Sequence, residues 1–370
     1  MARTADIAAR RPHYQRLLAA GTGRFFRPPR TTCPWCASDR LRHRLRSRDH
    51  VQNKPGTFVL DECRDCGHIF QNPQLTSEGL DFYYGDFYDG LGGESTAKMF
   101  AGRGSVKRFR HSARALRAHA SPRRWLDVGT SHGHFCATAK EELQDTEFHG
   151  LDIGESVELA VKEGRIAAAY RGQFTLLAEE LAGRYDTVSM FHYLEHTLTP
   201  RGELVAARTA LRPGGHLLIE VPNPESPLGR FFRGRWMPWF QPQHLHFVPI
   251  GNLCRELERL GFTVVSARRR GNQHIPVDLA CATWFWAARA MPKEDAPWLA
   301  RRPGRAAVAA RWAVALAALP PLLAAYGIDL LLAPLVRRTS LSNAYRVIAR
   351  RGPDNTLHNT PHDTPDGRGN

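Results

Sequence analysis

Between residues 105 and 270, short apolar runs alternate with segments in which apolar residues recur every three or four positions. The runs predict buried strands, and the segments predict amphipathic helices. Strands are expected at 124–128, 148–152, 185–190, 215–221 and 262–268, with a weaker one at 173–177. Helices are expected at about 100–120, 133–143, 155–163, 202–211 and 250–260. This alternation predicts an α/β fold, a parallel sheet with helices on both faces.

The pattern changes on both sides of this core. Residues 1–31 are rich in Arg and show only a short helical pattern from Tyr14 to Ala20, which favours a basic, flexible arm. Residues 352–370 are polar and rich in Pro, Asn and Asp, which predicts a disordered tail.

Residues 271–342 contain a long apolar run from Ala306 to Val336. A spanning helix needs about 20 uninterrupted apolar residues, and Pro320-Pro321 interrupts this run near its middle. Arginines flank both ends, which favours both ends on the cytoplasmic side. The interpretation is a helical hairpin over 306–336 that dips into one leaflet. Two Ala/Leu-rich helices packed on the domain or on a second subunit fit the pattern about equally well.

A turn follows the first core strand, where the apolar run ends at Gly129 and a helical pattern begins at Gly133. Neither glycine carries a Cβ, so the backbone can approach a ligand closely. Such spacing arises by chance when it stands alone. Asp152 closes the next strand, at the place where a βαβ unit holds a carboxylate that binds a ribose diol.

Further motifs follow in order, namely Tyr185-Asp186-Thr187-Val188, Leu194-Glu195-His196 and Leu211-Arg212-Pro213-Gly214-Gly215. Together with Leu126-Asp127-Val128-Gly129 and Asp152, they resemble the class I S-adenosylmethionine-dependent methyltransferases. The resemblance is to bacterial methyltransferase-23-like enzymes with an N-terminal cysteine-bearing module, some of which act on sugars and other secondary metabolites. It covers residues 105–270 and implies a Rossmann-like seven-stranded sheet that ends in an antiparallel strand at 343–351. Ser131 is a departure, because glycine is commonest at its place.

The resemblance implies that the cofactor lies where the first two core strands end. Asp152 would accept hydrogen bonds from both ribose hydroxyls, and Ile153 would border the adenine. Gly129 and Gly133 would approach the amino-acid moiety and the ribose, while Asp127 would order the loop. The expected cofactor-binding residues are Asp127, Gly129, Thr130, Gly133, Phe135, Asp152, Ile153, Phe191 and His192.

Methyl transfer also requires an acceptor held in line with the methyl group and, where the acceptor carries a proton, a base. Histidine is the usual base near neutral pH. His196 follows the strand at 185–190, and His244 follows the strand at 215–221. Because Glu195 and His196 are better interpreted as a pair that orders the loop, His244 is the preferred catalytic base and His196 the second candidate.

Residues 32–72 contain two CxxC pairs, Cys33 with Cys36 and Cys63 with Cys66, separated by 26 residues. Each pair aims two thiolates at one tetrahedral ion, which predicts a zinc ribbon holding Zn²⁺. A metal-free thiol or redox pair is the alternative. Four thiolates leave no open position on the metal, so the expected role is structural.

Residues 73–104 contain an aromatic segment, Phe82-Tyr83-Tyr84-Gly85-Asp86-Phe87-Tyr88. It suits a lid over the cofactor or substrate, and it equally suits a linker that docks the ribbon onto the core. A similar Tyr-rich segment lies near the cofactor in the methyltransferases that the chain resembles, which favours the lid slightly.

Composition adds two constraints. The net charge of +15 favours an acidic partner, which is a nucleotide-linked substrate, an anionic membrane or nucleic acid. The seven cysteines do not form a secreted disulfide pattern, and the first 30 residues lack the apolar segment of a signal peptide. The cytoplasm is therefore the expected compartment, at the inner face of the membrane if residues 306–336 contact it.

These features favour S-adenosylmethionine-dependent methyl transfer to a small-molecule, sugar or lipid-linked glycan acceptor. The alternative is an RNA methyltransferase that binds nucleic acid through the arm and ribbon. Against it, Phe191-His192-Tyr193 stands where base-amine methylation needs an Asn/Asp-Pro-Pro-aromatic motif, so nucleic acid is not the expected partner. A non-catalytic scaffold that binds a membrane or partner is disfavoured by the intact Asp127, Gly129, Gly133 and Asp152.

Overall fold

The computed structural model describes residues 2–87, 91, 92, 94, 98, 101–271 and 275–353. The strands are β1 (Leu41–Ser47), β2 (Phe58–Cys63), β3 (Ile69–Gln71), β4 (Arg124–Val128), β5 (Glu147–Asp152), β6 (Ala168–Arg171), β7 (Tyr185–Phe191), β8 (Leu211–Pro222), β9 (His246–Phe247), β10 (Phe262–Arg268) and β11 (Ala344–Arg351). The α-helices are α1 (Ala2–Leu18), α2 (Ser77–Tyr84), α4 (Arg103–Arg117), α5 (His134–Lys140), α6 (Ser156–Lys162), α7 (Phe174–Leu177), α8 (Pro200–Ala210), α9 (Pro227–Phe231), α10 (Ile250–Arg259), α11 (Asp278–Ala288) and α12 (Arg305–Arg338). Short 3₁₀ helices are η1 (Gly23–Phe25), η2 (Leu194–His196), η3 (Arg233–Arg235) and η4 (Met237–Trp239).

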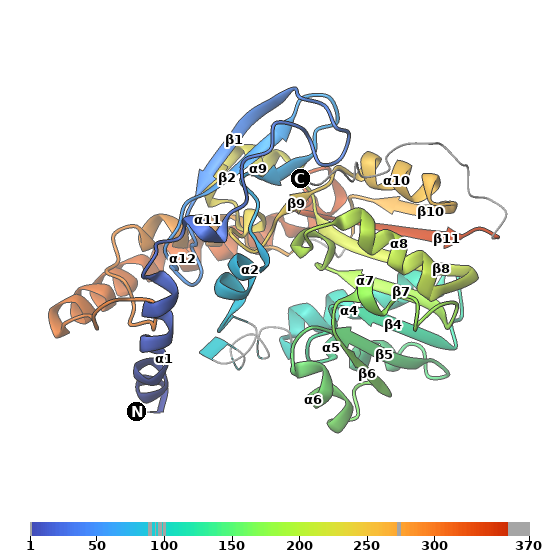
Figure 1. The fold of residues 1–370 in the computed structure, drawn as a ribbon, viewed down its shortest axis with the longest axis horizontal. Coiled ribbons are helices and arrows are strands. Elements are labelled where there is room, and N and C mark those ends of the chain that lie inside the picture. The colour runs from blue at the N-terminus through green and yellow to red at the C-terminus, as the bar shows by residue number, and fades with distance from the viewer. Residues whose placement is uncertain are drawn as a thin grey trace, which may run out of the picture.

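A seven-stranded sheet with the order β10-β11-β8-β7-β4-β5-β6 forms the core (Figure 1). The strands from β8 to β6 pair in parallel, whereas β11 is antiparallel to both β8 and β10. This confirms the predicted Rossmann-like sheet and its final antiparallel strand. The carboxyl ends of β4, β5, β7 and β8 therefore meet at one edge, which is where ligands bind in such sheets.

Helices cover both faces of this sheet, as predicted. On one face, α4 and α5 bury Phe109 and Phe135 against the strands. On the other face, α8 and α10 bury Leu204 and Leu253. The weaker strand expected at 173–177 is wrong, because residues 174–177 form α7. Gly172, with a φ of +155°, separates this helix from β6 and turns the apolar run back onto the core.

A second, antiparallel sheet has the order β1-β2-β3-β9. Its first three strands come from the cysteine-bearing segment, whereas β9 comes from the core, between β8 and α10. Trp35, Cys63 and Phe70 belong to the same hydrophobic cluster as Leu253 of α10. The N-terminal module is thus joined to the core by strand pairing and by shared packing.

The arm expected to be flexible is helical in the described residues, which corrects the prediction. The helix α1 buries Tyr14, whose hydroxyl donates to Asp86 Oδ2 at 2.8 Å. Arg10 forms an ion pair with Asp86 at 2.5 Å, and the Tyr14 ring contacts Phe82. The sequence pattern missed this helix because it is rich in Arg and has few apolar positions. Those positions are buried by residues distant in sequence. The tail expected to be disordered lies outside the described residues from position 354 onward.

The apolar run of the insertion forms one continuous helix, α12, with Pro320, Pro321 and Pro334 inside it. The insertion is helical as predicted, but the hairpin is wrong. Each proline removes one N–H donor, and the Ala- and Leu-rich turns around them are strong helix formers. α11 packs beside α12, and both Asp329 carboxylate oxygens accept backbone hydrogen bonds from Leu279 and Ala280 of α11.

Candidate functional site

The loop after β4 lies against β5 and is shaped by left-handed residues. The N–H of Gly129 donates to the Leu151 carbonyl at 2.8 Å. Gly129, Ser131 and Gly133 have φ values of +76°, +48° and +71°. A Cβ on Gly129 would lie 2.7 Å from the ring of Tyr193, so this position requires glycine. Ser131 adopts a left-handed conformation that glycine takes most easily.

Asp152 lies at the carboxyl end of β5 and is half-buried. Its Oδ2 accepts a hydrogen bond from the Ser131 N–H at 2.8 Å, and its Oδ1 accepts one from the Gly154 N–H at 2.9 Å. Burial raises the pKa of Asp152, and these backbone donors oppose the rise. The next residue, Ile153, is 66% exposed although it is apolar. A carboxylate and an apolar surface thus stand together where β4 and β5 end.

Asp127 lies inside the core beneath this loop. Its Oδ1 accepts from the Ser189 hydroxyl at 2.6 Å, and burial raises the pKa of Asp127 to about 7. Thr130 and Phe135 are also buried, and the Phe135 ring lies 4.3 Å from that of Phe191. These residues brace the loop from inside, whereas Gly129, Asp152 and Ile153 stand at its outer edge.

A carboxylate with three histidines lies beyond the carboxyl end of β7. Glu195 is buried, and its Oε1 lies 3.0 Å from His192 Nδ1 and 3.9 Å from His244 Nε2. The rings of His196 and His244 meet edge to face, with centroids 4.6 Å apart. Burial alone would raise the pKa of Glu195, but the hydrogen bond with His192 and the nearby histidines lower it to about 2. Glu195 is therefore ionised at neutral pH.

The hydrogen-bond partner of His244 indicates its tautomer. His244 Nδ1 lies 2.7 Å from the Pro238 carbonyl, which only accepts, so Nδ1 carries the hydrogen and Nε2 the lone pair. Burial lowers the pKa of His244 to about 3, which keeps the ring neutral. His196 Nδ1 lies 2.6 Å from the Tyr84 hydroxyl. The donor atoms of Glu195, His196 and His244 also lie within 4.8 Å of one another, a spacing that suits a metal ion.

The aromatic segment divides between the two roles considered for it. Phe82 and Tyr83 are buried in the N-terminal module, where Phe82 stacks on Phe25 at 4.6 Å. Tyr84 instead reaches the site, where its hydroxyl donates to the Gln243 carbonyl at 2.8 Å and lies close to His196 Nδ1. Tyr88 lies outside the described residues. The helix α2 thus both packs in the N-terminal module and contacts the candidate site.

Two further residues escaped the sequence interpretation. Tyr193 covers Gly129 of the loop after β4, and its hydroxyl donates to Glu203 at 3.0 Å. Arg108 of α4 is buried, and its Nη1 lies 3.8 Å from Glu220 Oε2 without a hydrogen-bond partner in the described part of the chain. Glu220 is already bound by Arg346 at 2.6 Å. Nothing in the sequence distinguishes Arg108 from the other arginines of its helix.

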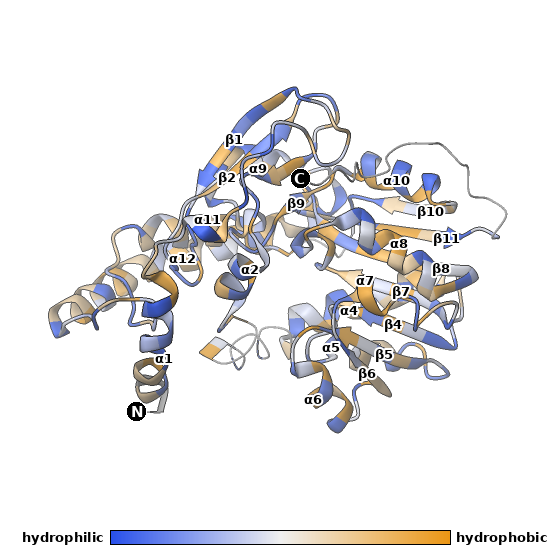
Figure 2. Cartoon of the chain, in the orientation of Figure 1, coloured by the Kyte–Doolittle hydropathy of each residue, from blue (hydrophilic) through white to orange (hydrophobic). Residues whose placement is uncertain are grey.

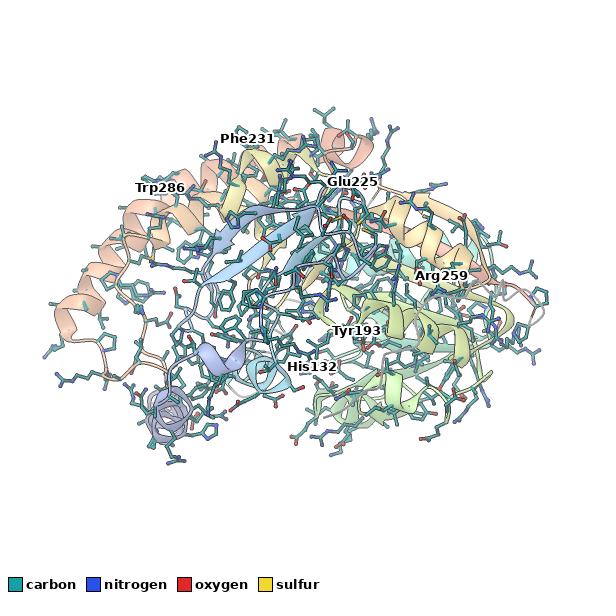
Figure 3. The ribbon with its side chains drawn as sticks, turned by 45° about the horizontal axis from the view of Figure 1, so that its top comes forward. His132, Tyr193, Glu225, Phe231, Arg259 and Trp286 are labelled. Carbon is teal, nitrogen blue, oxygen red and sulfur yellow. The ribbon has the colours of Figure 1, made fainter. Side chains whose placement is uncertain are left out.

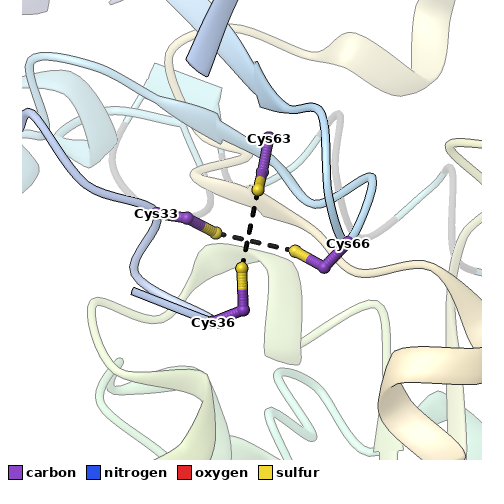
Figure 4. Close-up of side chains that lie close together, drawn as sticks. All are labelled: Cys33, Cys36, Cys63 and Cys66. Atoms are coloured by element: carbon purple, nitrogen blue, oxygen red, sulfur yellow. Dashed lines mark hydrogen bonds between the residues drawn. The ribbon is translucent and has the colours of Figure 1, made fainter. Parts of the chain in front are cut away.

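The four paired cysteines converge on one point (Figure 4). The sulfur atoms of Cys33 and Cys66 lie 3.7 Å apart, and those of Cys36 and Cys63 lie 3.5 Å apart. A tetrahedral Zn²⁺ with Zn–S bonds of about 2.3 Å places its ligand sulfurs about 3.8 Å from one another. The donor set and its spacing therefore fit Zn²⁺.

Comparison with known proteins finds similarity in the central part of the chain. Residues 103–267 match the sequence profile of a family described as a methyltransferase domain. A ubiquinone biosynthesis O-methyltransferase from Acinetobacter baumannii is 27% identical over 154 residues, which cover 38% of this chain and 63% of that protein. The corresponding protein from Marinobacter nauticus is 32% identical over 117 residues, which cover 29% and 47%. The chain thus spans less than two thirds of the length of these curated relatives.

Solved structures of similar proteins include an S-adenosylmethionine-dependent methyltransferase from Archaeoglobus fulgidus. It is 20% identical, and the match covers 67% of this chain and 96% of that one, with a TM-score of 0.42. Another is the 1,6-didemethyltoxoflavin-N1-methyltransferase of Burkholderia thailandensis, solved with 1,6-didemethyltoxoflavin and S-adenosylhomocysteine bound. It is 16% identical, with coverage of 74% and 87% and a TM-score of 0.41.

Proposed function

We propose that this protein, whose residues 103–267 match a family described as a methyltransferase domain, moves the methyl group of S-adenosylmethionine onto a small-molecule, sugar or lipid-linked glycan acceptor. The observation that carries the proposal is the edge where β4 and β5 end. There the left-handed Gly129 and the half-buried Asp152 adjoin the exposed, apolar Ile153. This combination matches a nucleoside with a ribose diol and an apolar base face.

Each part of this edge would hold a different part of the cofactor. Asp152 would accept hydrogen bonds from the ribose hydroxyls, because its backbone donors orient both oxygens and leave lone pairs to spare. Ile153 would pack on the adenine, and the bare backbone of Gly129 and Gly133 would allow close approach. When bound, S-adenosylmethionine supplies an electrophilic methyl group on its sulfonium sulfur.

Arg108 is the residue that we assign to the carboxylate of the cofactor. It is a buried cation whose Nη1 lies 3.8 Å from Glu220 Oε2 but has no hydrogen bond in the described part of the chain. Burial lowers the pKa of Arg108, and the nearby carboxylates of Glu220 and Glu195 oppose this effect. Glu220 lies near it but is shared with Arg346 and Ser112. A carboxylate from a ligand would complete the hydrogen bonding of the Arg108 guanidinium.

His244 is the residue that we assign as the general base. Its Nδ1–H is held by the Pro238 carbonyl, so Nε2 can accept the proton of an acceptor hydroxyl or amine. Glu195 lies 3.9 Å from Nε2 and stays ionised, so it would stabilise the imidazolium that forms. His196 is bound to Tyr84 and would position this group rather than take the proton. In the N-terminal module, Cys33, Cys36, Cys63 and Cys66 would hold Zn²⁺ in a structural role.

Calorimetric titration with S-adenosylmethionine tests the cofactor site. Asp152→Asn keeps the size of the side chain but removes its charge and half of its acceptor capacity. We expect affinity to fall by roughly 1.5–3 kcal/mol, or 10–100-fold, because a charge-assisted hydrogen bond is lost. Glu158→Gln on α6 is the matched control, since Glu158 forms a surface ion pair with Arg171. Equal affinity of wild type and Asp152→Asn, or no binding by either, would contradict the proposal.

A further inference from the structure

The helix α12 carries a large apolar surface that the rest of the described chain does not cover. It is 34 residues long, about 50 Å at 1.5 Å per residue, and by length and composition it could cross a membrane. Only 11% of the most apolar 18-residue stretch of this helix is buried. Between Arg311 and Arg337 the single charged residue is Asp329, and both of its oxygens are bound to α11.

Exposed apolar side chains occur along the whole of this helix. Figure 2 shows α12 as a mostly orange and pale element at the edge of the molecule, away from the seven-stranded sheet. Trp286 of α11 and Phe231 of α9 are 69% and 75% exposed, and Figure 3 shows both on the same outer side. The exposed large apolar residues of α12 are Val308, Trp312, Leu316, Leu319, Leu323, Tyr326, Ile328, Leu330, Leu331, Leu332 and Leu335.

Both ends of α12 are held by the same folded body. Near its start, Arg311 donates to the Pro292 carbonyl and pairs with Glu294 at 3.0 Å. At its end, the Arg337 carbonyl accepts from the Gly271 N–H at 2.8 Å, and the chain enters β11 in the central sheet. A helix that crossed a bilayer would separate its ends by about 30 Å of hydrocarbon. In this fold α12 therefore lies along a surface rather than through a membrane.

The charges around this surface distinguish two possible partners, a second copy of the chain and a lipid membrane. Arg301, Arg302 and Arg305 precede or begin the helix, and Arg337 and Arg338 end it. A second copy of the chain would bring an equally basic border against this one, which is unfavourable. An anionic lipid surface complements it, because arginines attract the head groups while apolar side chains enter the acyl boundary.

We infer that the exposed face of α12, with Trp286 and Phe231, docks this protein on an anionic membrane surface. The docking face is connected to the candidate site by direct contacts. Asp278 at the start of α11 accepts from Trp236 Nε1 at 2.7 Å, and Phe240, four residues on, packs against His244. A membrane-borne acceptor would then reach His244 from the docked side. This last step rests on the proposed function.

Co-sedimentation with vesicles tests the docking without cofactor or acceptor, so it stands or fails independently of methyl transfer. The probes are phosphatidylcholine vesicles with and without phosphatidylglycerol. The test variant is Leu316→Gln/Leu323→Gln/Leu331→Gln, whose leucines are 65%, 61% and 80% exposed, so the fold should survive. Leu176→Gln on α7, where Leu176 is 75% exposed, is the matched control.

We expect wild type and Leu176→Gln to bind the anionic vesicles and to bind neutral vesicles less well. The triple variant should bind at least about tenfold more weakly with its thermal unfolding unchanged, because three apolar anchors are lost. Absence of wild-type binding, or equal binding by the triple variant, would overturn the inference. So would a lipid-free dimer that the triple variant dissociates, because α12 would then be a contact between copies.

Discussion

His244 has two ring nitrogens with different partners, which allows its two roles to be separated. His244→Asn keeps an amide N–H near the position of Nδ1, so the bond to the Pro238 carbonyl can persist while Nε2 is lost. We expect unchanged affinity for S-adenosylmethionine and a roughly 10²–10⁴-fold loss of turnover, because only the base is removed. The measurement is transfer of labelled methyl groups into metabolites and lipids extracted from the host cell. Wild-type turnover in His244→Asn would remove His244 from the reaction.

A second prediction at the scale of one residue concerns Arg108 and the affinity for the cofactor. In Arg108→Gln, affinity for S-adenosylmethionine should fall about tenfold or more, because a charge-assisted contact to the carboxylate is lost. Affinity for methylthioadenosine should not change, because this ligand has no amino-acid moiety. Arg110→Gln is the control, since Arg110 of the same helix pairs with the exposed Glu141 and with Glu142. Equal weakening of both ligands would show that Arg108 supports the fold rather than the carboxylate.

At the scale of elements, local patterns predicted the core well. The strands expected at 124–128 and 262–268 have the observed bounds, because apolar alternation and flanking glycines are local signals. Two of the errors share one cause. The helix α1 and the unbroken α12 are stabilised by partners far away in the sequence, namely Asp86 and the N–H groups of α11. No window of sequence contains those partners.

The candidate site shows the same division. Gly129 and Asp152 could be predicted because one turn and the next strand form a contiguous motif. The group around Glu195 could not, because Tyr84 and His244 reach it from segments more than 40 residues away on either side. Histidines and tyrosines are common in sequence, and only the fold selects those that meet. Arg108 is a clearer case, since the lack of a hydrogen bond at its Nη1 is visible only once Glu220 and Arg346 are placed.

At the scale of the whole molecule, the net charge of +15 is distributed unevenly. Arg10 and Arg11 of α1 pair with Asp86 and Asp295, and Arg42 of β1 pairs with Glu62. Charges that are already paired release fewer counterions from a polyanion, which weakens the case for an RNA partner. At the ends of α12, Arg302 also pairs with Asp295. The other arginines there border an apolar surface, and that combination favours lipid over nucleic acid.

The N-terminal module and the core should also unfold together, because they share a sheet. β9 of the core pairs with β3, His68 Nε2 lies 3.1 Å from His246 Nδ1, and Asn252 of α10 donates to the Cys66 carbonyl. Loss of Zn²⁺ would free two loops that carry these contacts. We therefore expect Cys63→Ser to lose the bound ion and to lower the single unfolding temperature by on the order of 10 °C.

Metal analysis and scanning calorimetry measure both effects, and Cys254→Ser on α10 is the control, because Cys254 lies outside the cysteine cluster. A strong chelator added to wild type should reproduce the thermal shift of Cys63→Ser, since the thiolates then lose their common ligand. Two separate transitions in Cys63→Ser, with the core unfolding at its wild-type temperature, would show that the shared sheet does not couple the parts. A wild-type protein free of zinc that unfolds unchanged with chelator would instead make the cysteines a thiol cluster. Strand pairing and side-chain packing, including that of Trp35 against His68, would then hold the module.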